Sequence, residues 1–165
     1  MTLILQNLIA ALREELQQYG EMLARLDDQQ DLVMQRDASR LLQSVTAIEE
    51  QGLVIRRARE SREAFQCELS GLLGLPDDSG FSQILPLLPA DLQPLTQALV
   101  QENNDLLHRV QARARQNHLL LRQSLDLMQR FMNNLFPSHE PKIYNGGGQR
   151  YHKPVPAVSL YEAVG

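Results

Sequence analysis

One long stretch without proline decides the fold: residues 95–136 read LTQALVQENNDLLHRVQARARQNHLLLRQSLDLMQRFMNNLF. Apolar residues recur in it at spacings of three and four, which places them on one face of a helix. These residues are Leu95, Leu99, Leu106, Val110, Leu121, Leu125, Met128, Met132 and Leu135. Because a proline inside a helix costs about 3 kcal/mol or more, its absence predicts one helix that begins near Asp91 and stops before Pro137.

The N-terminal part of the chain, up to Leu75, also lacks proline and predicts two more long helices. The first begins after Thr2, a fair N-cap, and its apolar stripe runs through Leu5, Leu8, Leu12, Leu16, Tyr19, Leu23 and Leu26. We expect a break near residues 36–39, with Asp37 as the cap of the second helix. That helix runs from about Ala38 to Leu73, with Gly71 and Gly74 as stop signals and Pro76 as its end.

These three segments predict an all-α fold, an elongated antiparallel bundle of three long helices. We assign residues 1–136 to the bundle. Residues 137–165 carry four prolines, the run Gly146-Gly147-Gly148 and the only two lysines of the chain. This composition favours a flexible C-terminal tail without a packed core.

Composition and charge exclude several classes of protein. A net charge of −4 over 165 residues argues against a strongly basic nucleic-acid binder. A single cysteine, Cys67, excludes a disulfide framework and a zinc site built on several cysteines. No apolar run approaches the roughly 18 residues of a transmembrane helix, and the N-terminus does not resemble a signal peptide. We therefore expect a cytoplasmic protein.

The sequence predicts neither an enzyme nor a bound cofactor or metal ion. No glutamate precedes a histidine at the Glu-x-x-His spacing of bundle metal sites. His108 and His118 do not share a helical face, and no phosphate-binding glycine motif follows a strand.

Two groups of polar residues remain open to interpretation. The cluster Arg56, Arg57, Arg59 and Arg62 is expected to be a solvated helix face, with Glu60 and Glu63 as ion-pair partners within the helix. A nucleic-acid patch is the less favoured alternative, since nearby aromatic residues for base stacking are nearly absent. Asn103 and Asn117 fall near the core face, where a buried asparagine can fix the register of a coiled coil; half-exposed asparagines are an equal alternative.

The end of the third helix is apolar around most of its circumference, more than one buried stripe requires. This surplus predicts a surface that binds a helical partner, and its methionines suit varied partners. The expected partner-binding residues are Leu121, Leu125, Met128, Met132 and Leu135. The alternatives are that another part of this chain or a second copy covers the surface.

Several segments together resemble the FlgN-type flagellar export chaperones over nearly the whole chain. They are Arg36-Asp37-Ala38, Leu72-Leu73-Gly74-Leu75-Pro76, Gln101-Glu102-Asn103-Asn104-Asp105-Leu106-Leu107 and the tail segment Ile143-Tyr144-Asn145-Gly146-Gly147-Gly148-Gln149. The tail segment is similar to the pattern Tyr-Gly-x-x-Gly-Gln of that family, with Asn145 in place of the first glycine.

The resemblance implies a cytoplasmic, non-enzymatic chaperone of type III export without cofactors. Its clients are the hook–filament junction proteins, whose C-terminal helical segments it would bind to prevent premature assembly and deliver to the export gate and ATPase components. By family position, Tyr144 is expected to contact the export apparatus. The competing class is a structural or oligomerisation coiled coil without a client, and homo-oligomers are compatible with either.

Overall fold

The computed structural model describes residues 2–135, except for the side chain of Leu135. Every regular element in this part of the chain is helical, which confirms the predicted all-α class. The elements are α1 (Thr2–Gln35), α2 (Ala38–Leu72), α3 (Phe81–Ile84), the 3-10 turn η1 (Leu85–Leu87) and α4 (Gln93–Leu135). The predicted flexible tail and Tyr144 lie outside the described residues.

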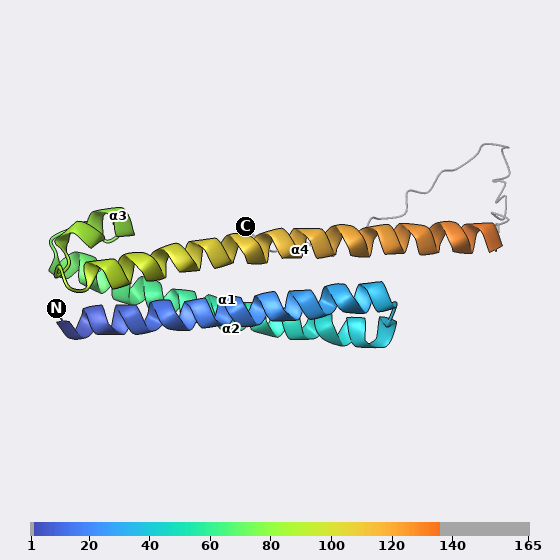
Figure 1. Cartoon of the computed structure of the whole chain (residues 1–165), viewed down its shortest axis with the longest axis horizontal. Coiled ribbons are helices and arrows are strands. Elements are labelled where there is room, and N and C mark those ends of the chain that lie inside the picture. The colour runs from blue at the N-terminus through green and yellow to red at the C-terminus, as the bar shows by residue number, and fades with distance from the viewer. Residues whose placement is uncertain (1, 136–165) are drawn as a thin grey trace, which may run out of the picture. The chain divides into compact units, whose positions relative to one another are not determined.

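The chain divides into two compact units, residues 1–125 and the part from Asp126 onward. In the first unit α1 and α2 form an antiparallel hairpin, and α4 runs alongside in the direction of α1 (Figure 1). The second unit contributes the last turns of α4, up to Leu135, to the described part of the chain. The prediction of three long helices, the first two antiparallel, is confirmed.

The turn between α1 and α2 is built from two residues. Arg36 adopts a left-handed backbone conformation with a φ of 59°, and the N–H groups of Arg36 and Asp37 donate to the carbonyls of Val33 and Leu32. These two bonds form a Schellman motif, which satisfies carbonyls at the end of α1. The Asp37 carboxylate then accepts a 3.0 Å bond from the Arg40 N–H, which confirms it as the predicted cap of the second helix.

The end of α2 follows the same rule, here with glycine in the left-handed position. Gly74 has a φ of 71°, and the N–H of Leu75 donates to the Ser70 carbonyl over 2.9 Å. Such a φ suits glycine, which has no Cβ to clash. The predicted stop at Gly74 and Pro76 is therefore confirmed, whereas Gly71, the other predicted stop signal, lies inside the last turn of α2.

Two groups of buried apolar side chains hold the first unit together. One joins the start of α1 to the end of α2, to the α3–η1 segment and to α4, through Leu5, Leu8, Leu12, Leu69, Ile84, Leu88 and Leu99. The other joins the middle of α1 to α2, through Tyr19, Met22, Leu26 and Ile55, with Leu106, Leu107 and Val110 of α4 packed against it. Most of the apolar stripe expected for the first helix is thus buried, while two of its residues, Leu16 and Leu23, are only half-buried.

Candidate functional site

Two buried asparagines of α4 attach it to α1. The side-chain amide of Asn103 donates to the Leu12 carbonyl over 2.9 Å, and that of Asn117 donates to the Leu26 carbonyl over 2.7 Å. The exposed fractions of these asparagines are 6% and 1%. This decides between the two alternatives left open by the sequence, because both residues lie in the interface.

The two contacts repeat one geometry along the helix pair. The asparagines lie two heptads apart, the two carbonyls also lie two heptads apart, and each bond joins residues 91 positions apart. A slip of α4 by one turn would break both bonds, although the Asn103 amide would keep its second bond, 2.9 Å to the Leu99 carbonyl of its own helix. The two contacts therefore define the register in which α4 lies on α1 in this structure.

A charged contact flanks this interface. The Arg113 guanidinium lies 2.8 Å from a carboxylate oxygen of Asp27 in α1, and it also donates to the side-chain carbonyl of Gln30. Charges beside the core positions of paired helices contribute to the choice of partner and orientation. In this segment the position of α4 on α1 is thus determined by two buried amides and by a flanking ion pair.

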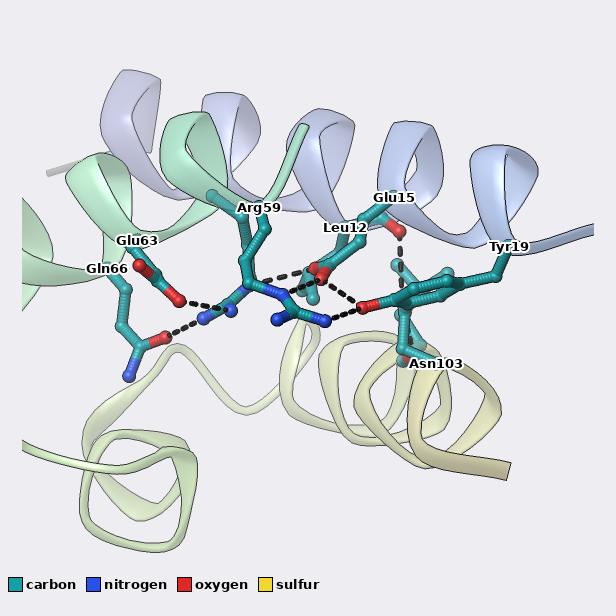
Figure 2. A network of polar contacts seen from close by, with 9 residues as sticks. Leu12, Glu15, Tyr19, Arg59, Glu63, Gln66 and Asn103 are labelled. Carbon is teal, nitrogen blue, oxygen red and sulfur yellow. Dashed lines mark hydrogen bonds and ion pairs between the residues drawn. The ribbon is translucent and has the colours of Figure 1, made fainter. Parts of the chain in front are cut away.

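A second polar network joins α1 to α2 (Figure 2). The buried Glu15 carboxylate accepts from Tyr19 Oη over 2.8 Å and from Arg62 Nε over 2.9 Å. The Arg59 guanidinium donates to Tyr19 Oη over 2.7 Å. Burial raises the pKa of the Tyr19 phenol above its ordinary value of 10.0, and the neighbouring Glu15 adds to the rise while Arg59 opposes it.

This network corrects the expectation of a solvated arginine face for Arg59 and Arg62. Arg59 was expected to pair with Glu63 within α2, whereas it contacts Tyr19 and Glu15 of α1. Arg62 pairs with Glu63 and with Glu15 and is mostly buried. The spacing in the sequence missed these contacts because Glu15 is brought to α2 only by the packing of the hairpin.

The predicted partner-binding residues lie at the far end of α4. Leu121 is half-buried, while Leu125, Met128 and Met132 have exposed fractions of 65%, 64% and 50%. Nothing is described for the side chain of Leu135, and Tyr144 lies outside the described residues.

Two further residues belong to the same apolar surface. Leu127 and Phe131 have exposed fractions of 66% and 61%. At about 100° per residue they fall on the face of α4 that carries Asn117, beside Met128. The sequence prediction left both out because it followed a single three-four series. A heptad pattern continued from the buried asparagines would have included Leu127 and Phe131.

We name the exposed face formed by Leu125, Leu127, Met128, Phe131 and Met132 the distal stripe.

Neither a metal centre nor a membrane span is found among the described residues. Within residues 2–135 no three His, Cys, Asp or Glu side chains are grouped so that they could hold a metal ion. None of the helices in that range combines the length and the apolar character needed to cross a bilayer.

Comparison with protein families matches residues 1–152 to the family described as FlgN protein. A search of curated proteins and a search of solved structures each found no match to this chain. The family match covers α1, α2, the connecting segment and α4.

Proposed function

Because this chain belongs to the FlgN family, the non-enzymatic chaperones of the flagellar hook-associated proteins during export, we propose that the distal stripe is the site where it holds its clients. FlgN chaperones are cytoplasmic, and we place this chain in that compartment. Leu121 and Leu135, which share the face of the stripe by their spacing, complete the proposed surface.

The observation that carries the proposal is the exposure of five large apolar side chains along one helical face. Their exposed fractions lie between 50% and 66%. Single exposed apolar residues are ordinary, but a continuous series is typical of an interaction surface. Fully burying each such side chain stabilises a complex by at most about 1.5–3 kcal/mol, so several together suffice for stable binding.

The spacing of the stripe supports a helix as the bound segment. Upstream on α4, the same face receives α1 through residues at heptad positions, among them Asn103, Val110 and Asn117. A face with the same periodicity further along the helix fits an amphipathic client helix in an equivalent position. We propose that this helix is the C-terminal segment of a hook-associated protein. Its apolar face would otherwise be free to self-associate.

The proposal is tested by replacing Met128 and Met132 together with serine. Binding of the client's C-terminal segment, measured by calorimetry, should weaken at least tenfold, because two apolar contacts of up to about 1.5–3 kcal/mol each are lost. Helicity should remain unchanged, since both side chains are exposed.

Leu119→Ser provides the matched control, because Leu119 is 57% exposed but points to the opposite side of α4. The affinity of the Leu119→Ser variant for the client's C-terminal segment should equal that of the unmodified chain. Equal affinity of the double methionine variant would contradict the proposed site. Concentration-dependent self-association that disappears in that variant, without client binding, would favour the oligomerisation coiled coil instead.

A further inference from the structure

An open pocket lies between α1 and α2, near the turn that joins these two helices. Its volume is about 420 Å³, and its charged lining residues are Arg25, Asp28 and Asp31 of α1 and Arg40 of α2. All of its lining residues come from α1 and α2, so the pocket is complete without α4. We name this feature the tip pocket.

Small side chains on α2 leave this part of the hairpin open. Ser44 and Ala47 line the tip pocket, where larger residues would fill the space. One turn beyond Ala47, the side chain of Gln51 donates to the backbone carbonyl of Gln18 over 3.0 Å and to its side-chain carbonyl over 2.8 Å. This bridge spans the two helices, and the tip pocket ends before it.

The four charged side chains of the tip pocket have no partner in the described part of the chain. Among residues 2–135, no ion pair or side-chain hydrogen bond involves the side chains of Arg25, Asp28, Asp31 or Arg40. The Nε of Arg25 is even buried without an acceptor there. By contrast, the neighbouring Asp27 pairs with an arginine of α4. Two cations and two anions thus line one hollow with their pairing capacity unused.

The mixture of charges determines which class of ligand fits the tip pocket. A nucleic acid or an anionic membrane would bring phosphates to Asp28 and Asp31 as well as to the arginines, and like charges in contact disfavour a complex. A protein segment carries carboxylates and cations side by side. Arg25, Asp28 and Asp31 follow one another at intervals of about 4.5 Å along α1. Charges one turn apart on a partner helix have a similar spacing.

We propose that the tip pocket docks a helix of a second protein, which directs carboxylates to Arg25 and Arg40 and basic side chains to Asp28 and Asp31. Complementary charges fix the register of such a contact and exclude partners of a single sign. The tip pocket shares no residue with the distal stripe. A chain that holds a client can therefore dock on a second protein at the same time.

The test uses the isotope-labelled full-length chain and three designed alanine-based helical peptides of equal length. The mixed peptide carries glutamate and lysine four residues apart on one face, and the other two carry only glutamate or only lysine at these positions. In NMR titrations at low salt, the mixed peptide should bind at least threefold more tightly than either of the others. The shift changes should be largest between residues 25 and 47, and added salt should weaken the binding.

Two double variants test the assignment of the charges. Arg25→Gln with Arg40→Gln should weaken binding of the mixed peptide at least threefold, and Asp28→Asn with Asp31→Asn should shift the preference to the glutamate peptide. Circular dichroism should show unchanged helicity in both variants, because these side chains form no contacts that the fold requires.

Arg115→Gln with Arg122→Gln is the matched control. Both arginines are exposed on α4 and do not line the tip pocket, and the net charge changes by the same amount as in the Arg25 and Arg40 variant. The affinity for the mixed peptide should remain that of the unmodified chain.

Several results would overturn the proposal. They are equal affinities for the three peptides, a preference of the unmodified chain for the glutamate peptide, and binding of the mixed peptide that ignores the Arg25 and Arg40 substitutions. Self-association of the unmodified chain that Arg25→Gln with Arg40→Gln abolishes, measured by sedimentation, would assign the tip pocket to a second copy instead.

The tip pocket and the distal stripe are tested separately. Binding of the client's C-terminal segment should be unchanged by Arg25→Gln with Arg40→Gln, and binding of the mixed peptide should be unchanged by Met128→Ser with Met132→Ser. Either proposal can therefore fail while the other stands.

Discussion

At the scale of single residues, the side chain of Asp37 determines where α2 begins. Its carboxylate accepts from the Arg40 N–H directly after the left-handed Arg36. Replacing Asp37 by alanine leaves a helix N–H without its cap and should lower the free energy of unfolding by about 1 kcal/mol. Urea unfolding followed by circular dichroism measures this change.

Asp37→Asn is the matched control, since asparagine caps helices about as well as aspartate. Its stability should stay within a few tenths of a kcal/mol of the unmodified chain. Equal losses in both variants would mean that charge, not the cap bond, is what Asp37 contributes.

The buried phenol of Tyr19 makes the free energy of unfolding fall at alkaline pH. Burial raises its pKa in the folded chain above the ordinary value of 10.0, so the folded state holds this proton more tightly than the unfolded state does. The contribution of this tighter proton binding to the free energy of unfolding is fully present below about pH 10. It is lost as the pH rises through the pKa of Tyr19 in the folded chain.

Tyr19→Phe isolates this effect. Near neutral pH the variant should be less stable by about 1–2 kcal/mol, because Glu15 and Arg59 lose a buried partner. Above pH 10 the difference in unfolding free energy between the two chains should narrow, because only the unmodified chain loses stability by deprotonating residue 19. A difference that is constant with pH would show that Tyr19 has no raised pKa.

At the scale of elements, the two buried asparagines of α4 restrict its register on α1, and they lower the stability of the bundle relative to apolar residues at the same positions. Their side-chain oxygens have no hydrogen-bond partner among the described residues, and each amide nitrogen is directed at α1. Replacing both by valine should keep or raise the thermal midpoint, as apolar residues do at such positions, while weakening the preference for one register.

The measurement is sedimentation velocity combined with thermal unfolding. We expect additional oligomers or a broadened transition in the double valine variant, with a midpoint that is not lowered. The double variant Leu106→Val, Leu107→Val alters the same interface without touching the amides and should remain uniform. A strongly lowered midpoint for Asn103→Val with Asn117→Val would show that the amides mainly contribute stability.

The positions of the helices could be predicted from the sequence, whereas several of their contacts could not. Proline and glycine determine where helices end through local sterics, so the end of α2 at Gly74 follows from the residues alone. The break at Arg36 has no such residue, and only Asp37 pointed to it. The pairing of Glu15 with Arg59 and Arg62 depends on how the hairpin packs, which intrahelical spacing does not contain.

At the scale of the whole molecule, the tail and the bundle are expected to have separate tasks. The prolines and glycines of residues 137–165 argue against a packed role, while Tyr144 occupies the family position expected to contact the export apparatus. Tyr144→Ala should therefore impair filament assembly in cells while client binding in vitro persists, because aromatic side chains often anchor recognition segments.

Truncation after Phe136 is the companion measurement. It should leave the thermal midpoint of the bundle nearly unchanged, since few buried contacts would be removed. Tyr161→Ala, another tail tyrosine, is the control for assembly in cells. A fall of many degrees in the midpoint of Tyr144→Ala would mean that this residue packs on the bundle.

The connection between α2 and α4 has a consequence for the order of folding. The hairpin of α1 and α2 closes over a two-residue turn, whereas α4 docks on the closed hairpin across the longer segment between Leu72 and Gln93. Since each doubling of loop length adds about 0.6 kcal/mol of entropic cost, roughly three doublings make the loop closure for α4 costlier by about 2 kcal/mol. We therefore expect the helix that carries the distal stripe to pack after the hairpin has formed and to detach before the hairpin opens.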